Sequence, residues 1–338
     1  MNQEQKNSVN VRFLVIRFSS IGDIVLTTPV VRLMKQQIDG AEIHFVCKEK
    51  YEPVLRANPY IDKLHMLDSS LPELIKKLQS EDFDHIIDLS NNIRSWQIKR
   101  KLHPNAFSLK KLNIKKWLLV NFKINLMPNK HVVDRYIEAA SLFDICNDNR
   151  GLDHFVPHDE ECPVESLPEG FRQGYIAFVI GGTYATKRLP PHKIAEICKA
   201  IDIPVILIGH KKEFDHGETI VSNAPARILN LAGKTTINQS ALLVKNARLV
   251  LTNDTGLMHI AAAYHKPILS FWGNTVPAFG MTPYMPHPAS LILETPNVKC
   301  RPCSKLGFDK CPKKHFRCMN EINTSIAISW INENFDKQ

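Results

Sequence analysis

The 338-residue chain contains no apolar run long enough to form a membrane-spanning helix. Its longest hydrophobic runs have the length of single strands, whereas a spanning helix needs about 20 consecutive apolar residues. Residues 1–10 are polar and lack the apolar core of a signal peptide. We therefore expect a cytoplasmic protein without a transmembrane segment.

The chain also lacks several motifs that identify nucleotide-binding and nucleic-acid-binding proteins. No Gly-x-Gly-x-x-Gly sequence follows the first predicted strand, and no P-loop with its Gly-Lys-Ser/Thr ending occurs. Zinc-finger, helix-turn-helix and RNP-type patterns are missing as well. These absences argue against a dehydrogenase and place nucleic acid below anionic lipid as a partner.

Positive charge is abundant and unevenly distributed, with a formal net charge of +9 at pH 7. Within residues 94–130, which we call the basic segment, cations alternate with Trp96, Trp117 and Phe122. The cations of this segment are Arg94, Lys99, Arg100, Lys101, Lys110, Lys111, Lys115, Lys116, Lys123 and Lys130. Such a segment can attract nucleic acid, an anionic membrane or a phosphorylated substrate, and a plain solvated surface is the alternative.

Strand and helix patterns alternate twice along the chain. Strands are predicted at 11–18, 41–48, 61–67, 83–89, 175–180, 204–208, 249–253, 267–273 and 291–294. Helices are predicted at 19–38, 51–57, 71–81, 132–145, 192–201, 214–222, 236–247, 254–263 and 322–335. This alternation predicts an α/β fold of parallel sheets covered on both faces.

A turn-rich, acidic stretch at 147–170 separates the two halves of the pattern and suits a linker. We expect an N-terminal domain at 1–150, a C-terminal domain at 171–321 and a closing helix at 322–338. Two Rossmann-like domains facing a central cleft are the simplest architecture, with ligands bound at the carboxyl ends of the strands.

The stretch 249–263 combines a buried strand, a polar turn and an Ala-rich helix. Asp254 and Thr255 stand where the helix begins, and Gly256 allows a close backbone approach. His259 follows Thr255 by four residues and shares its helix face. The pattern indicates a phosphate site at a helix N-terminus, and an ordinary capped helix is the alternative.

Two other strand-to-helix turns carry candidate site residues. In Ser19-Ser20-Ile21-Gly22-Asp23, a carboxylate at a helix start suits a general base, although Asp is also a common helix cap. In the stretch 181–187, glycines precede Thr183 and Lys187, which offer a hydroxyl and a charge to a phosphate. Glu213 could accept ribose hydroxyls, or it could be an exposed residue at a helix start.

Four of the eight cysteines lie near the C-terminus, at Cys300, Cys303, Cys311 and Cys318, close to His315. Cys300 and Cys303 have the spacing of a zinc knuckle, but the second pair lacks it. Reduced structural thiols are therefore favoured over a zinc site. A stable disulfide is expected less than either in a cytosolic chain.

Taken together, these turns resemble those of glycosyltransferase family 9, the lipopolysaccharide heptosyltransferases. The matching positions are residues 17–23, Thr183 with Lys187 and Pro190, Gly209 with Glu213, residues 252–259 and the Cys-rich tail. The resemblance covers nearly the whole chain in the right order. The turns at 20–23 and 253–259 are specific in combination and weak singly.

The resemblance implies a GT-B fold, with an ADP-heptose donor bound mainly by the C-terminal half. It implies an anionic glycolipid acceptor, bound by the N-terminal half at the inner leaflet of the cytoplasmic membrane. Transfer with inversion, without a cofactor or required metal, is also implied. By position, Asp23 is the catalytic base. The implied donor-binding residues are Gly22, Thr183, Lys187, Glu213, Asp254, Thr255, Gly256 and His259, and the candidate acceptor contacts are Lys99, Arg100 and Lys101.

Two departures from the family pattern leave the donor sugar open. Leu189 stands where the family often has Trp, and Asn274 stands where Pro is common. Two other functions stay open as well. A GT-B sugar-nucleotide epimerase would use the same phosphate site, and a non-catalytic nucleotide- or lipid-binding module could keep the same fold.

Overall fold

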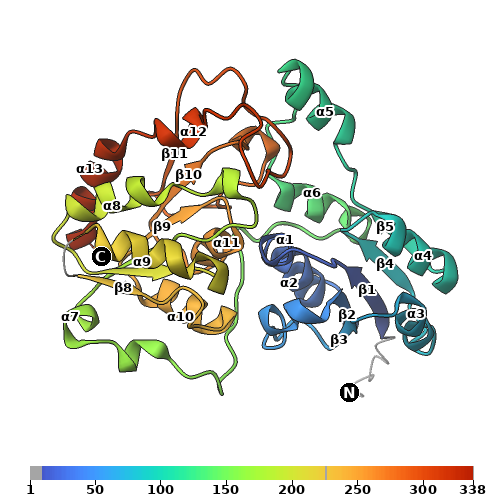
Figure 1. Cartoon of the computed structure of the whole chain (residues 1–338). Coiled ribbons are helices and arrows are strands. Elements are labelled where there is room, and N and C mark those ends of the chain that lie inside the picture. Colours follow the sequence, from blue (N-terminus) through green and yellow to red (C-terminus); the bar gives the residue numbers. More distant parts are fainter. Residues whose placement is uncertain (1–9, 225–226, 338) are drawn as a thin grey trace. The chain divides into compact units, whose positions relative to one another are not determined.

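The computed structural model describes residues 10–224 and 227–337, and these group into two compact units (Figure 1). The first unit comprises the chain up to Lys111 together with Val132–Phe155. The second comprises Leu112–His131 together with the chain from Val156 onward. Each unit contains one parallel sheet with helices on both faces, which confirms the predicted α/β class.

The first unit is built on a five-stranded sheet in the order β3-β2-β1-β4-β5. Its strands are β1 (Val11–Ile16), β2 (Ala41–Lys48), β3 (Lys63–Leu67), β4 (His85–Asp88) and β5 (Asn105–Ser108). Its helices are α1 (Ile21–Val25), α2 (Thr28–Gln37), α3 (Leu71–Gln79), α4 (Ile93–Leu102) and α6 (Val132–Glu138), with 3₁₀ turns η1 (Glu49–Val54) and η2 (Ser141–Phe143).

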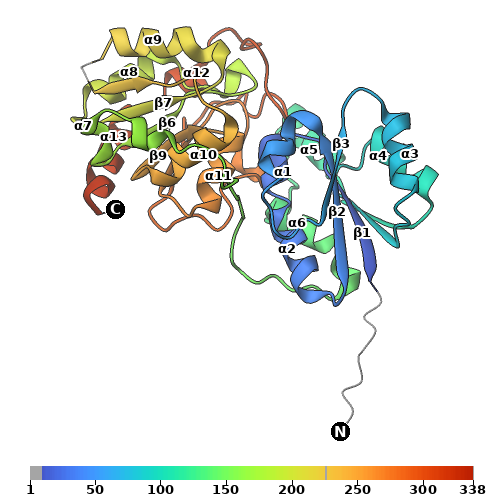
Figure 2. The ribbon, with the colours of Figure 1, turned by 90° about the horizontal axis from the view of Figure 1, so that it is seen from below.

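Helices α3 and α4 cover one face of this sheet, and α1, α2 and α6 lie on the other (Figure 2). On the α3 side, Leu14 and Val46 of the sheet pack with Leu74 and Leu78 of α3 and with Ile98 of α4. The central strand β1 is apolar and buried on both faces, as parallel sheets require.

The second unit is built on a six-stranded parallel sheet in the order β11-β10-β9-β6-β7-β8. Its strands are β6 (Ile176–Val179), β7 (Val205–Ile208), β8 (Ile228–Asn230), β9 (Leu249–Asn253), β10 (Ile268–Trp272) and β11 (Leu291–Glu294). Its helices are α5 (Asn113–Phe122), α7 (Glu169–Arg172), α8 (Pro191–Lys199), α9 (Phe214–Ser222), α10 (Ile237–Asn246), α11 (Gly256–Ala263), α12 (Arg317–Asn320) and α13 (Thr324–Asn334). Its 3₁₀ turns are η3 (Pro163–Ser166), η4 (Ala185–Lys187), η5 (Lys211–Glu213), η6 (Pro277–Phe279) and η7 (Phe335–Lys337).

The segment that contains α5 belongs to the second unit, although the sequence analysis groups it with the N-terminal domain. Lys123 Nζ donates to the carbonyl oxygens of Cys300 at 3.1 Å and Pro302 at 2.8 Å. The His131 ring contacts the Thr282 carbonyl oxygen at 2.8 Å. These bonds join residues far apart in sequence, and so the sequence pattern does not reveal them.

The remaining differences from the predicted elements are local. The predicted helix at 19–38 is two helices, because Pro29 lies in the first turn of α2 and cannot continue an earlier helix. The predicted helix at 132–145 ends at Glu138. The short edge strands β5 and β8 were not predicted, because they have no clear alternation in sequence. Within the described residues, no helix is both long and apolar enough to cross a membrane.

Candidate functional site

The first candidate site residue, Asp23, lies in the turn that follows the central strand β1. Asp23 occupies the third position of α1, and its Oδ2 accepts hydrogen bonds from the Ser20 backbone N–H at 3.0 Å and hydroxyl at 2.9 Å. Its Oδ1 lies 2.5 Å from Nη2 of Arg17. The side chain keeps 22% of its surface exposed. The carboxylate is therefore oriented by two residues but still accessible to solvent.

The guanidinium of Arg17 is itself held firmly. Its Nε donates to the Ser19 carbonyl at 3.0 Å, and its Nη1 donates to the Leu89 carbonyl at 2.5 Å. The group also lies over the Tyr136 ring, 5.7 Å from its centroid. Burial opposes its charge, but Tyr136, Asp23 and Asp88 together raise the pKa of Arg17 above its ordinary value. Arg17 is thus a fixed, permanently charged partner of Asp23.

The second candidate site lies in the second unit, where β9 ends and α11 begins. This confirms the predicted strand, turn and helix at 249–263. Asp254 Oδ2 lies 2.6 Å from Nζ of Lys187 and accepts a hydrogen bond of 3.0 Å from the Thr275 hydroxyl. Thr255 is the N-cap and Gly256 the first helical residue, while His259 lies one turn further and is buried. Lys187 therefore lies next to the N-terminus of α11.

Gly182 lies between the two turns of this site. A Cβ atom built on Gly182 would lie 3.0 Å from Cγ of Arg188 and 3.7 Å from Cγ2 of Thr255. Thr183, the next residue, is exposed. The structure therefore brings the turn at 181–187 beside the turn at 254–256, because β6 and β9 are neighbours in the sheet.

Asn253, which the sequence analysis does not select as a site residue, ties these turns together. Its buried amide Nδ2 donates to the carbonyl oxygens of Val179 at 3.2 Å and Gly181 at 3.1 Å. Its Oδ1 accepts a hydrogen bond of 2.9 Å from the Leu189 backbone N–H. Every one of these partners is a backbone group. The side-chain pattern of the sequence therefore does not predict that Asn253 connects the turns.

The loop from the end of β10 supports the same turn from another side. The Thr186 hydroxyl contacts Oδ1 of Asn274 at 3.1 Å and accepts a hydrogen bond of 2.8 Å from the Phe308 N–H. Thr275, one residue on, has its carbonyl bound by Nη2 of Arg301 at 2.8 Å. Asn274, where the family often has Pro, is thus a structural contact of the loop that carries Lys187.

Glu213 differs from the exposed helix-start residue that the sequence allows. It is fully buried, and its Oε1 lies 2.8 Å from Nη1 of Arg188. Its Oε2 accepts a hydrogen bond of 3.0 Å from the His210 backbone N–H and lies 3.5 Å from a Cβ built on Gly181. Glu213 is therefore packed against the turn at 181–187. Arg188 was not predicted as a site residue, because the sequence shows it only as a second cation next to Lys187.

The candidate acceptor contacts lie on α4 of the first unit. Lys99 Nζ lies 2.8 Å from the buried carboxylate of Asp88 and donates to the Ser108 hydroxyl at 2.8 Å. Arg100 is exposed, with its guanidinium 5.4 Å from the centre of the Trp96 ring, and Lys101 is exposed as well. Lys99 thus has structural partners, whereas the next two cations face solvent.

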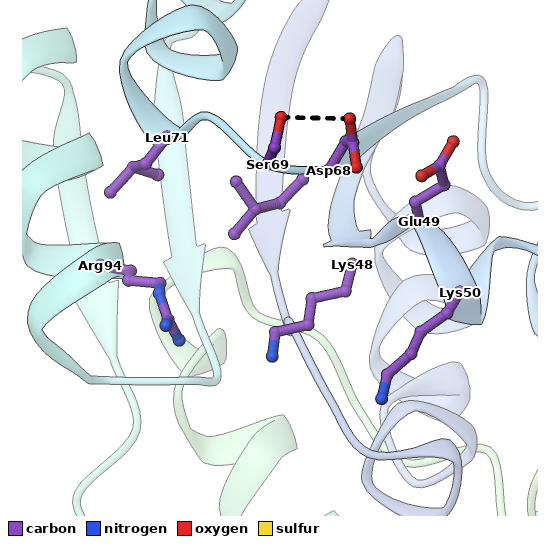
Figure 3. A pocket seen from close by; sticks show the side chains of 8 residues that line it. Lys48, Glu49, Lys50, Asp68, Ser69, Leu71 and Arg94 are labelled. Carbon is purple, nitrogen blue, oxygen red and sulfur yellow. Dashed lines mark hydrogen bonds between the residues drawn. The ribbon is translucent and has the colours of Figure 1, made fainter.

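A pocket of about 380 Å³ lies in the first unit, at the carboxyl ends of β2 and β3 (Figure 3). Lys48, Lys50 and Arg94 reach toward the same side of it (Figure 3). Its lining residues are Lys48, Glu49, Lys50, Leu67, Asp68, Ser69, Leu71 and Arg94. Of these cations only Arg94 belongs to the basic segment, and the two lysines come from a different part of the chain.

All eight cysteines are free thiols. The Cys300 sulfur lies 3.8 Å from Nε2 of His315. Burial, together with Cys300, raises the pKa of Cys303 to about 12, and burial raises the pKa of Cys318 to about 11. A bound metal ion would itself displace the thiol protons, so the preference for structural thiols over a zinc site stays a prediction.

Comparison with known proteins identifies the class of protein. A family model described as glycosyltransferase family 9 (heptosyltransferase) matches residues 72–306. The molecule is therefore a glycosyltransferase of the GT-B class, built from two Rossmann-like units. The chain belongs to glycosyltransferase family 9, which confirms the resemblance seen in the sequence.

Individual relatives agree with this assignment. The chain is 27% identical to lipooligosaccharide heptosyltransferase 2 of Haemophilus influenzae, with 95% of this chain and 98% of that protein covered. It is 26% identical to lipopolysaccharide heptosyltransferase 1 of Campylobacter coli, with 78% and 84% covered. The solved structure of Escherichia coli ADP-heptose lps heptosyltransferase II matches with a TM-score of 0.75 at 21% identity, covering 97% of this chain and 99% of that one, and so shows the fold.

Proposed function

We propose that this chain transfers a heptose from ADP-heptose to a hydroxyl group of the lipopolysaccharide inner core. Its relatives are named as heptosyltransferases of lipopolysaccharide and lipooligosaccharide, and one solved structure carries ADP-heptose in its name. The observation that carries the proposal is the contact between Lys187 and Asp254 at the start of α11. That arrangement suits a diphosphate, which is the shared part of every nucleotide-sugar donor.

The donor diphosphate in this proposal binds where α11 begins. The first N–H groups of a helix are free to donate, and the helix dipole favours an anion there. Lys187 would turn from Asp254 toward the diphosphate, and the exposed hydroxyl of Thr183 would add a contact. For Glu213 to accept hydrogen bonds from the ribose, the Arg188 side chain would have to move away from its buried carboxylate. His259 and Gly256 would line the same pocket.

The chemical step in this proposal is a single displacement with inversion at the anomeric carbon. The acceptor hydroxyl attacks that carbon while Asp23 accepts its proton, and Gly22 leaves room in the turn. The bond to the diphosphate breaks at the same time. Lys187 and the α11 N-terminus stabilise the charge that develops on the leaving group. None of these roles requires a metal ion.

Product analysis tests this function. The protein is incubated with ADP-heptose and an inner-core acceptor, with and without a chelator, and ADP release and product linkage are measured. We expect ADP release that depends on the acceptor, an inverted anomeric configuration and no effect of the chelator. Epimerised donor formed without acceptor would support the epimerase instead. Donor binding without any turnover would support a non-catalytic module.

The acceptor in this proposal is an anionic glycolipid, and the pocket of Figure 3 suits its negative groups. Lys48 and Arg94 line that pocket, and Arg100 and Lys101 extend the positive charge along α4. Replacing Lys48 and Arg94 by Gln is expected to raise the acceptor KM and weaken its salt dependence, with donor KM unchanged. An unchanged acceptor KM would assign this pocket another role.

We also propose that the enzyme is cytoplasmic and binds the inner leaflet of the cytoplasmic membrane through α5. Ile114, Trp117 and Phe122 of this helix are 76%, 55% and 59% exposed. The centroids of the Trp117 and Phe122 rings lie 5.2 Å apart. Lys115, between Ile114 and Trp117 in the sequence, is exposed. Exposed aromatic and basic residues on one helix are typical of helices that lie in the membrane interface.

Vesicle binding tests the role of α5. Trp117→Ser combined with Phe122→Ser is expected to weaken binding to anionic vesicles by about tenfold or more, because two rings no longer enter the interface. Leu142→Ser is the matched control, because Leu142 is 72% exposed but lies in the first unit. Equal vesicle binding by both variants and the unmodified protein would remove α5 from the proposal.

A further inference from the structure

A cluster of three potential metal ligands lies in the first unit, away from the sites described above. His44 Nδ1 on β2 lies 3.0 Å from Nε2 of His65 on β3 and 3.9 Å from Oε2 of Glu81, which follows α3. One ligand atom from each residue lies within 4.8 Å of the others. Both imidazoles are almost fully buried, at 1% and 7% exposed.

The position of this cluster separates it from the catalytic turn. In the parallel register, His44 lies opposite Leu14 and His65 lies opposite Val46, on the sheet face that α3 covers. Asp23 instead follows the carboxyl end of β1. A ligand bound by this cluster would therefore join the edge strand β3 to β2 and to the end of α3.

A second layer of contacts orients the three side chains. His44 Nε2 lies 2.8 Å from Oε1 of Glu42, and Arg12 holds the other oxygen of Glu42 at 2.9 Å. Lys63 Nζ lies 2.5 Å from Oε1 of Glu81. If the His44 proton is on Nε2, donated to Glu42, its Nδ1 lone pair faces His65 and Glu81. A carboxylate behind a ligating histidine is the usual outer partner in zinc sites.

Packing around the cluster also restricts the side chains. Phe83 packs edge-on against the His44 ring, 5.1 Å between centroids, and limits its rotation.

We propose that His44, His65 and Glu81 bind one divalent transition-metal ion of the zinc type, which clamps β3 in place. Two nitrogens bound to tetrahedral zinc at ordinary bond lengths lie about 3.3 Å apart, close to the 3.0 Å between these imidazoles. The Glu81 oxygen, 3.9 Å from His44 Nδ1, would have to move closer to the two imidazoles to complete the set. Two imidazoles and one carboxylate favour zinc over magnesium or calcium.

Cobalt binding to the full-length, chelator-treated protein tests the site. Co²⁺ is added at neutral pH, and its visible absorption reports coordination by nitrogen and oxygen, whereas thiolate ligands add an intense near-ultraviolet band. We expect one Co²⁺ bound without the thiolate band, displaced by Zn²⁺. With Zn²⁺ at about a hundredfold excess over Kd, we expect Tm to rise by about 5 °C. Absence of binding, or binding through thiolates alone, would overturn the proposal.

Matched variants locate the metal. His65→Asn and Glu81→Gln are each expected to weaken Co²⁺ binding by about tenfold or more. His103→Asn is the control, because His103 is exposed and its left-handed backbone (φ +62°) suits Asn. Should His65→Asn fail to fold, Glu81→Gln decides, because it keeps the side-chain size. Unchanged affinity in Glu81→Gln would show that these residues are a hydrogen-bonded cluster without a metal.

Discussion

The two units place an aspartate at the same kind of position, and each aspartate is paired with a cation. Asp23 follows the central strand of the first unit and lies 2.5 Å from Arg17. Asp254 follows β9 of the second unit and lies 2.6 Å from Lys187. The two ion pairs have nearly the same length. The difference between them lies in how each cation is held.

Arg17 is held by carbonyl oxygens and by an aromatic ring in addition to Asp23. Among the described residues, the structure records one ion-pair partner for Lys187, the carboxylate of Asp254. A planar guanidinium with several fixed hydrogen bonds holds its partner in one geometry, whereas an ammonium on a flexible chain can change partners. We therefore expect Arg17 to keep Asp23 as its partner, and Lys187 to exchange Asp254 for another anion.

The largest expected effect comes from Asp23→Asn, which keeps the size of the side chain but removes its ability to accept a proton. We expect kcat to fall by about 10²- to 10⁴-fold, because a positioned general base contributes that much. ADP binding should stay near normal, because the proposed diphosphate site belongs to the second unit. Activity like that of the unmodified protein would show that Asp23 is not the base.

Exchanging each cation for Gln tests the contrast directly. Arg17→Gln leaves buried carbonyl groups and Asp23 without their partner, so we expect the free energy of unfolding to fall by about 2–4 kcal/mol. Lys187→Gln should lower stability by only about 1 kcal/mol while weakening ADP binding by about 10- to 100-fold. Urea unfolding and calorimetric ADP titration measure the two quantities. If both variants changed the free energy of unfolding and the ADP affinity to the same extent, the two cations would not differ in role.

A smaller effect is expected from Thr275→Val, which removes the hydroxyl that donates to Asp254. The loss of one hydrogen bond should cost about 1 kcal/mol and appear as a severalfold change in donor KM. Because Val keeps the shape of Thr, packing around the buried side chain is nearly preserved. A change as large as that of Lys187→Gln would mean that the position of Asp254, rather than the charge of Lys187, controls donor binding.

Much of the fold could be predicted from the sequence, because the central strands are continuous apolar runs separated by turn residues. The strands at 41–48 and 291–294 and the helix at 214–222 begin and end where the pattern places them. Edge elements such as β5 and β8 were not predictable, because their short strands carry no alternation. The grouping of α5 with the second unit depends on bonds such as that from Lys123 to the Pro302 carbonyl.

The candidate site likewise has residues that could be predicted from the sequence and residues that could not. Asp23, Lys187 and Asp254 could be selected from the sequence, because their types and their places after strands point to acid–base and phosphate chemistry. Asn253 could not be assigned its role, because it acts through backbone groups of two other segments. The partner of Glu213, Arg188, likewise becomes evident only when the ends of β6 and β7 are side by side.

The sequence by itself determined that this protein has two Rossmann-like halves, and it marked the turns to which we assign the chemistry. Those properties follow from local patterns of apolar and turn residues, which need no knowledge of distant contacts. Only the tertiary structure decided the partner of each charged group, including Arg17 for Asp23, and the meeting of His44, His65 and Glu81. Such contacts depend on the order of the strands in each sheet, which differs from their order in the sequence and is not encoded in the local pattern.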